Sequence, residues 1–126
     1  MLPGGADPAG IEEEQDLLTS AASSCPNSVL VVGGYSQGAA VAHRAIEALP
    51  SNVQNRIAGV VTYGDTQNQQ DNGQINNFAA DKVKVICNQG DLVCVGTLTI
   101  LAPHLDYGRR AGEGVDFLVG KINAAL

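Results

Sequence analysis

The sequence SVLVVGGYSQGAAVAHRAIEAL, residues 28–49, joins a short apolar run to an alanine-rich segment through a pair of glycines. Residues 28–32 are apolar throughout after the first serine, which predicts a buried strand. Residues 37–49 have the composition of a helix whose alanines allow close approach to a sheet. Between the two lies Gly34-Tyr35-Ser36-Gln37-Gly38, so the pattern predicts a tight strand-to-helix turn with Ser36 at its apex.

A turn of the form G-x-S-x-G after a strand and before a helix is typical of a nucleophile elbow. We expect glycine two residues either side of Ser36 because larger side chains would clash with the backbone there. The turn would lift the Ser36 hydroxyl above the sheet, and the N–H of Gln37 would point at a developing oxyanion. The alternative is a glycine-rich turn in which the serine has no chemical role.

A nucleophilic serine needs a base, and the chain has only two histidines. His43 lies seven residues beyond Ser36, about 10 Å along the helix axis, so we expect a surface or packing residue. His104 lies in the segment APHLDYG, in a loop after the third predicted strand. This is the position expected of the base.

Two aspartates compete to orient that base, since Asp65 and Asp91 each closely follow a predicted strand. Asp106 is disfavoured because it lies too near His104 in the sequence. Asp91 is favoured because the order Ser36, Asp91, His104 is the order of α/β-hydrolases. Asp65 remains the alternative.

Three cysteines are present, and two of them, Cys87 and Cys94, bracket the segment NQGDLV. A loop this short can close as a disulfide, which would stiffen the backbone around Asp91. Zinc binding is the other possibility, but a lone cysteine pair without a nearby histidine does not match a zinc site. A disulfide indicates an oxidising compartment, and Cys25 is left over.

Composition restricts the class of protein further. The chain has 126 residues, 44% of them hydrophobic, and a formal net charge of −6. There is no basic cluster to bind phosphates, so we expect no nucleic-acid partner. No apolar run is long enough for stable membrane insertion, and MLPGGADPAG lacks the basic and apolar parts of a signal peptide.

Further elements are predicted along the rest of the chain. We expect helices at residues 7–24 and 114–126, and strands at residues 57–62 and 82–87. Strands that alternate with helices predict an α/β fold, a three-layer α/β/α arrangement around a parallel central sheet. We expect residues 1–126 to form a single domain.

Three segments, GGYSQGAAV, CNQGDLVC and APHLDYG, resemble the signature segments of fungal cutinases, which are small secreted serine esterases of the α/β-hydrolase fold. The resemblance runs over nearly the whole chain. It implies a nucleophile, an oxyanion donor, an acid and a base at Ser36, Gln37, Asp91 and His104, respectively. It also implies a disulfide between Cys87 and Cys94, no metal and no cofactor.

The family has an open cleft with an apolar rim, which suits aliphatic esters or the surface of a polyester such as cutin. By resemblance Leu98, Ile100 and Leu105 would form this rim, with core packing as an equally open alternative. Tyr35, which precedes the serine, is a further candidate for substrate binding. Acetylxylan esterases share the GYSQG segment, so a deacetylase is another possible activity. We expect a secreted monomer.

Cutinases also have a stretch before the helix at residues 7–24, which supplies the first strands and a second oxyanion donor. We expect that stretch to be missing here, together with the partner of Cys25. The sheet would then expose an edge through which copies could associate. The loss of an oxyanion donor typically costs about 10²- to 10³-fold in rate. A non-catalytic remnant, or a complementation fragment that binds apolar surfaces, is therefore the alternative function.

Overall fold

Three parallel strands form the only sheet in the described part of the chain. The computed structural model describes residues 5–126, so the first four residues of MLPGGADPAG lie outside the described residues. The strands are β1 (Leu30–Tyr35), β2 (Ile57–Tyr63) and β3 (Val83–Ile86), in the order β1-β2-β3. The parallel sheet predicted from the sequence is confirmed.

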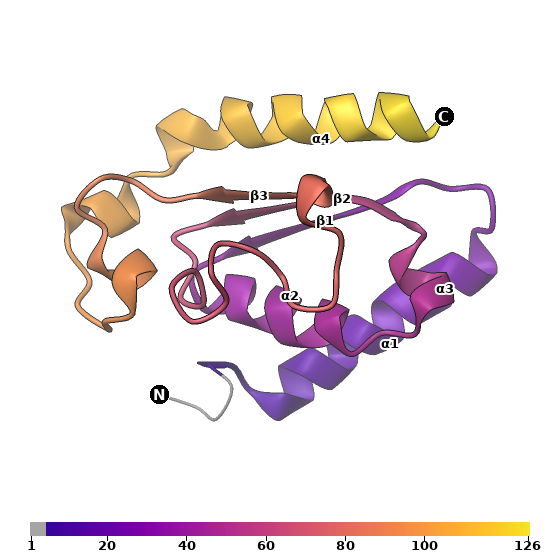
Figure 1. The fold of residues 1–126 in the computed structure, drawn as a ribbon, viewed down its shortest axis with the longest axis horizontal. Helices are drawn as coiled ribbons and strands as arrows, with labels where there is room; N and C mark the ends of the chain where they lie inside the picture. Colours follow the sequence, from indigo (N-terminus) through magenta and orange to yellow (C-terminus); the bar gives the residue numbers. More distant parts are fainter. Residues whose placement is uncertain (1–4) are drawn as a thin grey trace.

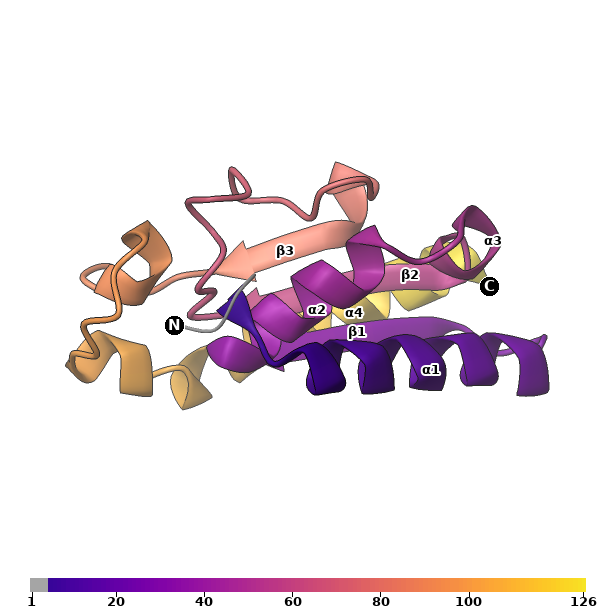
Figure 2. The ribbon, with the colours of Figure 1, turned by 90° about the horizontal axis from the view of Figure 1, so that it is seen from below.

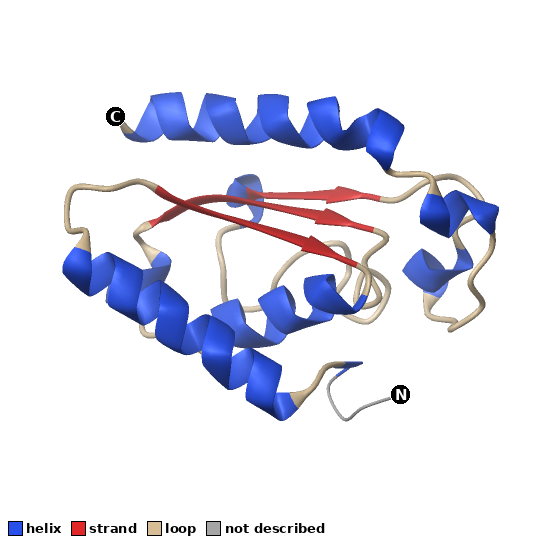
Figure 3. Cartoon of the chain, turned by 180° about the vertical axis from the view of Figure 1, so that it is seen from behind, coloured by secondary structure: helices blue, strands red, loops and turns tan. Residues whose placement is uncertain are grey.

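Helices cover both faces of this sheet, as Figures 1 and 3 show. They are α1 (Pro8–Ser24), α2 (Gln37–Glu47), α3 (Ser51–Gln54) and α4 (Ala111–Ala125). Helix α4 packs on β2 from one side, whereas α2 packs on β1 from the other side with α1 against its outer surface. The predicted three-layer α/β/α arrangement is therefore confirmed. Short 3₁₀ helices lie at Ala80–Lys82, Leu92–Val95, Ala102–Leu105 and Gly108–Arg110.

The first strand differs from the prediction in position and in burial. It begins at Leu30 and continues through both glycines to Tyr35, and only Val32 is buried. Val31 is 38% exposed. The prediction of a buried strand is wrong because, among the described residues, β1 is an edge strand that pairs with β2 alone. The central strand β2 is buried everywhere except Tyr63.

Two clusters of apolar side chains hold the layers together, one on each face of the sheet. The cluster on the α2 side comprises Val32, Ala42, Ile46, Leu49, Val53, Ile57, Val60 and Ile75. The cluster on the α4 side comprises Val61, Ile86 and Tyr107, with Tyr63, Phe117 and Leu118 against them. Burial of such side chains supplies most of the favourable free energy of folding.

The carboxyl ends of the strands are in register. Tyr35 pairs with Tyr63, and Tyr63 pairs with Ile86, so the strands end at one edge of the sheet. The segments that follow β3 gather at the same end, coloured orange in Figure 2. In parallel α/β sheets, this is the edge where binding sites form.

Candidate active site

The turn between β1 and α2 holds Ser36 in a strained conformation, with φ 57° and ψ −118°. Its N–H donates to the carbonyl of Tyr63 at 2.9 Å, which ties the turn to β2. A Cβ on Gly34 would lie 2.8 Å from the carbonyl oxygen of Gly38, so glycine is needed before the serine, as predicted. A Cβ on Gly38 would meet open space, and the same prediction for that position is wrong.

Ser36 in this turn meets two other predicted residues, which come from separate loops. The Oγ of Ser36 lies 2.9 Å from Nε2 of His104, and Nδ1 of His104 lies 2.9 Å from Oδ2 of Asp91. His104 and Asp91 are 2% and 3% exposed. Because the carboxylate takes a hydrogen bond from Nδ1–H, Nε2 is left as the acceptor for the serine hydroxyl. The arrangement can therefore remove a proton from Ser36.

Asp91 accepts hydrogen bonds from two donors besides His104. The hydroxyl of Tyr107 donates to Oδ2 at 2.5 Å, and the N–H of Val93 donates to Oδ1 at 3.1 Å. Burial alone would raise the pKa of Asp91, but the hydrogen bonds from Tyr107, His104 and Val93 lower it below its ordinary value. For Tyr107, burial and the neighbouring carboxylate raise the pKa to about 12, so its hydroxyl stays a donor. Asp91 is consequently ionised.

The loops that carry Asp91 and His104 are fastened to each other. Cys87 and Cys94 form the predicted disulfide across the Asp91 loop. Within that loop, the side-chain amide of Asn88 donates to the carbonyls of Pro103 at 2.8 Å and of Asp106 at 2.7 Å. Neither Asn88 nor Tyr107 was predicted from the sequence to be a site residue. Their only signal was their place inside CNQGDLVC and APHLDYG.

Tyr35 faces the histidine loop. Its hydroxyl donates to the main-chain oxygen of His104 at 2.6 Å, and its ring stacks on the imidazole at 5.3 Å between centroids. Because the hydroxyl is already engaged, the side chain offers its half-exposed ring rather than a hydrogen bond to a substrate. Tyr35 thus joins the serine turn to the base.

The competing candidates lie elsewhere. Asp65 contacts the other histidine, His43, whose Nε2 lies 2.5 Å from Oδ2 of Asp65. His43 is completely buried, so the surface alternative is wrong and the packing alternative is right. Asp106 forms an exposed ion pair with Arg109 at 2.7 Å.

A cavity of about 450 Å³ opens beside Ser36. Its other lining residues are Gly5, Gln37, Thr66, Val93, Leu98 and Ile100. Leu98 and Ile100 are 59% and 61% exposed, which excludes core packing for both. Leu105, 72% exposed, borders a separate hollow next to Tyr35. Exposed aliphatic side chains therefore lie around the serine.

The N–H of Gln37 is the main-chain donor nearest in sequence to the serine. Gln37 is the first residue of α2, so its N–H has no carbonyl one turn earlier to bond. It also lies at the positive end of the helix dipole, where negative charge is stabilised. An anion that develops beside Ser36 can therefore be stabilised there.

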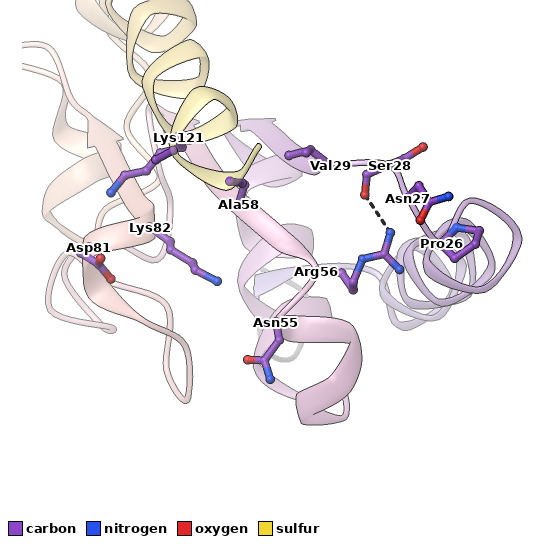
Figure 4. Close-up of a pocket in the computed structure, with 12 residues that line it drawn as sticks. Pro26, Asn27, Ser28, Val29, Asn55, Arg56, Ala58, Asp81, Lys82 and Lys121 are labelled. Carbon is purple, nitrogen blue, oxygen red and sulfur yellow. Dashed lines mark hydrogen bonds between the residues drawn. The ribbon is translucent and has the colours of Figure 1, made fainter.

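Another hollow, of about 490 Å³, lies at the opposite end of the sheet and is drawn in Figure 4. Arg56, which lines this hollow, donates to the carbonyls of Ala22, Cys25 and Ser28 at 2.7–2.8 Å. These hydrogen bonds fix the turn between α1 and β1. Cys25 is exposed and forms no disulfide within the described residues. We assign no chemistry to this hollow.

Residues 5–126 contain neither a metal-binding cluster nor a membrane-spanning helix. Within that range, no group of three or more histidine, cysteine or acidic side chains could hold a metal ion. Nor does any helix in that range have the length and apolar character needed to cross a bilayer.

Comparisons with known proteins identify the family. A family model described as Cutinase matches residues 1–122. Cutinase CUT2 of Pyricularia oryzae is 52% identical over 122 residues, which are 97% of this chain and 57% of that protein. Cutinase 2 of Fusarium vanettenii is 48% identical over 98% of this chain and 54% of its own length. The structure of Trichoderma reesei cutinase in complex with a phosphonate inhibitor matches 90% of this chain and 50% of that chain, with a TM-score of 0.82 and 38% identity. The chain thus spans about half the length of the curated relatives that it matches.

Proposed function

Because this chain belongs to the cutinase family, we propose that it acts as a serine carboxylester hydrolase through an acyl-enzyme on Ser36. The observation that carries the proposal is the continuous hydrogen-bonded line from Ser36 through His104 to Asp91, with both distances at 2.9 Å. A hydroxyl, an imidazole and a carboxylate in this order form the triad that activates serine in esterases.

The first half of the proposed reaction forms the acyl-enzyme. Nε2 of His104 takes the proton of the Ser36 hydroxyl as Oγ attacks the ester carbonyl carbon. The N–H of Gln37 donates to the carbonyl oxygen as it becomes negative. Asp91 stabilises the imidazolium, which then gives its proton to the departing alkoxide, so that an alcohol leaves.

The second half returns the enzyme to its starting state. His104 takes a proton from water, the hydroxide attacks the acyl carbon, and the imidazolium returns the proton to Oγ of Ser36 as the carboxylic acid leaves. The N–H of Gln37 is the one oxyanion donor that we assign among residues 5–126. A site with two donors is expected to turn over about 10²- to 10³-fold faster than a site with one.

The substrate class follows from the surroundings of Ser36. Leu98 and Ile100 line its cavity and are largely exposed, which suits an aliphatic acyl chain or the surface of a polyester such as cutin. Leu105 and the ring of Tyr35 extend the apolar surface on the other side of the histidine loop. We propose that the protein is secreted, since disulfides such as Cys87–Cys94 form and persist mainly in oxidising compartments.

A fluorophosphonate probe and p-nitrophenyl butyrate test this function together. The chain should be labelled and should hydrolyse the ester, and Ser36→Ala should lower the rate by at least about 10⁴-fold. Ser51→Ala, at an exposed serine in α3, is the matched control and should retain both activities. Equal rates in the Ser36→Ala variant and the unmodified chain would refute the proposal. Acetylated xylan, compared with longer acyl esters, distinguishes a deacetylase.

A further inference from the structure

A buried cluster of charges joins α2 to the loop that follows β2. Nε2 of His43 lies 2.5 Å from Oδ2 of Asp65, and Nδ1 lies 2.7 Å from Oδ2 of Asp71. Arg44 forms an ion pair with Asp71 and another with Glu47, the latter at 3.1 Å. His43 and Asp65 are completely buried, and Asp71 is 5% exposed.

The two carboxylates fix the protonation state of the imidazole. Each ring nitrogen of His43 faces a carboxylate oxygen, so each must carry a hydrogen for both contacts to be hydrogen bonds. Burial lowers the pKa of His43, but the hydrogen bonds and charges of Asp65 and Asp71 outweigh it and raise the pKa above 6.5. The cations His43 and Arg44 then balance the two aspartates.

The same loop, residues 64–73, touches the reacting groups. A Cβ on Gly64 would lie 2.9 Å from Cε1 and from Nδ1 of His104, so this backbone lies directly against the imidazole. Thr66 lines the cavity beside Ser36. Further along, the side-chain amide of Asn68 donates to the carbonyl of Cys94, in the Asp91 loop, at 3.1 Å. The loop therefore borders the cavity beside Ser36, the ring of His104 and the loop that carries Asp91.

Asp65 connects the buried cluster to the start of this loop. Its Oδ2 accepts from the hydroxyl of Thr62 at 2.8 Å, besides the bond from His43, and its Oδ1 accepts from the N–H of Gln67 at 2.8 Å. Gly64 on one side and Thr66 on the other are thereby fixed by a side chain that cannot move without leaving a buried charge unpaired. Such a charge is costly in a protein interior.

We propose that His43 is a positioning residue for the reaction of Ser36: its ring, clamped between Asp65 and Asp71, fixes loop 64–73 and thereby sets the backbone under His104 and the Thr66 wall of the substrate cavity. This inference rests on the proposed esterase function for its catalytic consequence. Desolvation of buried ions offsets much of their attraction, so the cluster contributes fixed geometry more than stability.

The structural part of the proposal is tested without catalysis. With only two histidines in the chain, ¹⁵N-histidine NMR resolves both rings, and the His104→Gln variant assigns them. At pH 6.5, where half of the rings of a histidine with ordinary pKa are neutral, most His43 rings should carry protons on both nitrogens, because each nitrogen faces a carboxylate. A mostly neutral ring of His43 at this pH would overturn the proposal.

Amide hydrogen exchange then tests the clamp. In Asp65→Asn, the hydrogen-bonded amides of Asp71 and Gly73 should exchange roughly tenfold faster than in the unmodified chain. Asp116→Asn, an exposed site on α4, is the matched control and should leave them unchanged. If Asp65→Asn does not fold, Asp71→Asn is read at Gly73. Unchanged exchange in the folded variant overturns the proposal.

The catalytic part of the proposal is tested by comparing kcat/KM for two substrates. If the cluster positions the cavity wall, the ratio of kcat/KM for octanoate and butyrate esters should change at least about threefold in Asp65→Asn. Partial unfolding lowers both values equally and leaves this ratio constant, so a constant ratio overturns the positioning role. An unmodified chain that no fluorophosphonate labels would refute the esterase function, while the NMR and exchange results would still decide whether His43 clamps the loop.

Discussion

The two histidines of this chain both bind aspartate, yet their surroundings differ at one ring nitrogen. His104 faces a carboxylate on Nδ1 and a hydroxyl on Nε2. His43 faces carboxylates on both nitrogens. An imidazole between a carboxylate and a hydroxyl can gain and lose a proton during a reaction, whereas one between two carboxylates keeps both of its protons. The partner of the second nitrogen thus separates a base from a clamp.

Replacing each histidine by glutamine should separate the two roles most clearly. His104→Gln should lower the rate of fluorophosphonate labelling by about 10⁴-fold, because nothing else near Ser36 can take its proton. His43→Gln should instead lower the free energy of unfolding by about 3 kcal/mol, because it leaves a buried carboxylate unpaired.

Labelling kinetics and urea denaturation measure these two effects. Per folded molecule, His43→Gln should retain labelling to within about tenfold. If the two variants lost labelling to the same extent, the distinction between base and clamp would be wrong.

The clamp should also appear in the pH dependence of stability. The pKa of His43 is raised in the folded chain, so its contribution is fully present below 6.5 and is lost as the pH rises through the folded pKa. The free energy of unfolding should therefore fall by up to about 1.4 kcal/mol per pH unit in that window. Urea denaturation across this range, with His43→Gln as the reference, cancels the other titrating groups. Parallel curves for the two proteins would contradict the raised pKa.

Tyr107 offers a smaller and more local test on the side of the base. Tyr107→Phe removes the hydroxyl that donates to Asp91, so the pKa of Asp91 should rise toward 3.8 and labelling should slow about tenfold. A lowered aspartate pKa stabilises the fold above 3.8, and this contribution is lost as the pH falls through the folded value. The variant should thus unfold at higher pH on acidification.

Tyr63→Phe is the matched control for this substitution. The hydroxyl of Tyr63 donates to the carbonyl of Ala111 at 3.2 Å and makes no described contact with Asp91. Stopped-flow labelling and acid titration by circular dichroism should leave this variant like the unmodified chain. Equal slowing in both tyrosine variants would mean that Tyr107 acts through packing and not through its hydrogen bond.

The sequence predicted the base more fully than the clamp. Ser36 and Asp91 each lie in a short motif close after a strand, and a parallel sheet brings such positions to one edge. His104 lies in a short motif further along the segment that follows β3. Asp65 and Asp71 meet His43 only because loop 64–73 folds back over α2, and no local pattern encodes that return. The hydrogen bond from Tyr107 to Asp91 likewise depends on how two loops pack.

The burial of β1 was predicted wrongly for a related reason. The apolar run before Ser36 resembles the run in β2, yet only β2 has strands on both sides among the described residues. The exposure of Val31 is thus a property of its neighbours and not of its own segment. Gly38 likewise lies in open surroundings, although the motif predicted a clash for any larger side chain there.

The cavity beside Ser36 is where the regions of the two histidines meet, and it provides the smallest test. Thr66 comes from the loop that His43 clamps, and Leu98 from the segment that follows the Asp91 loop. Leu98→Ala should lower kcat/KM for an octanoate ester about fivefold and for a butyrate ester less, because only the longer acyl chain reaches the side chain of Leu98, which is 59% exposed.

Thr66→Ser, which removes one methyl group, should change the ratio of kcat/KM for the octanoate and butyrate esters about twofold. Initial rates on both esters measure the effects. If Thr66→Ser shifted the ratio more than Leu98→Ala, the loop held by His43 would determine acyl length; if neither shifted it, the acyl chain would lie outside this cavity and Leu105 would be the next residue to replace.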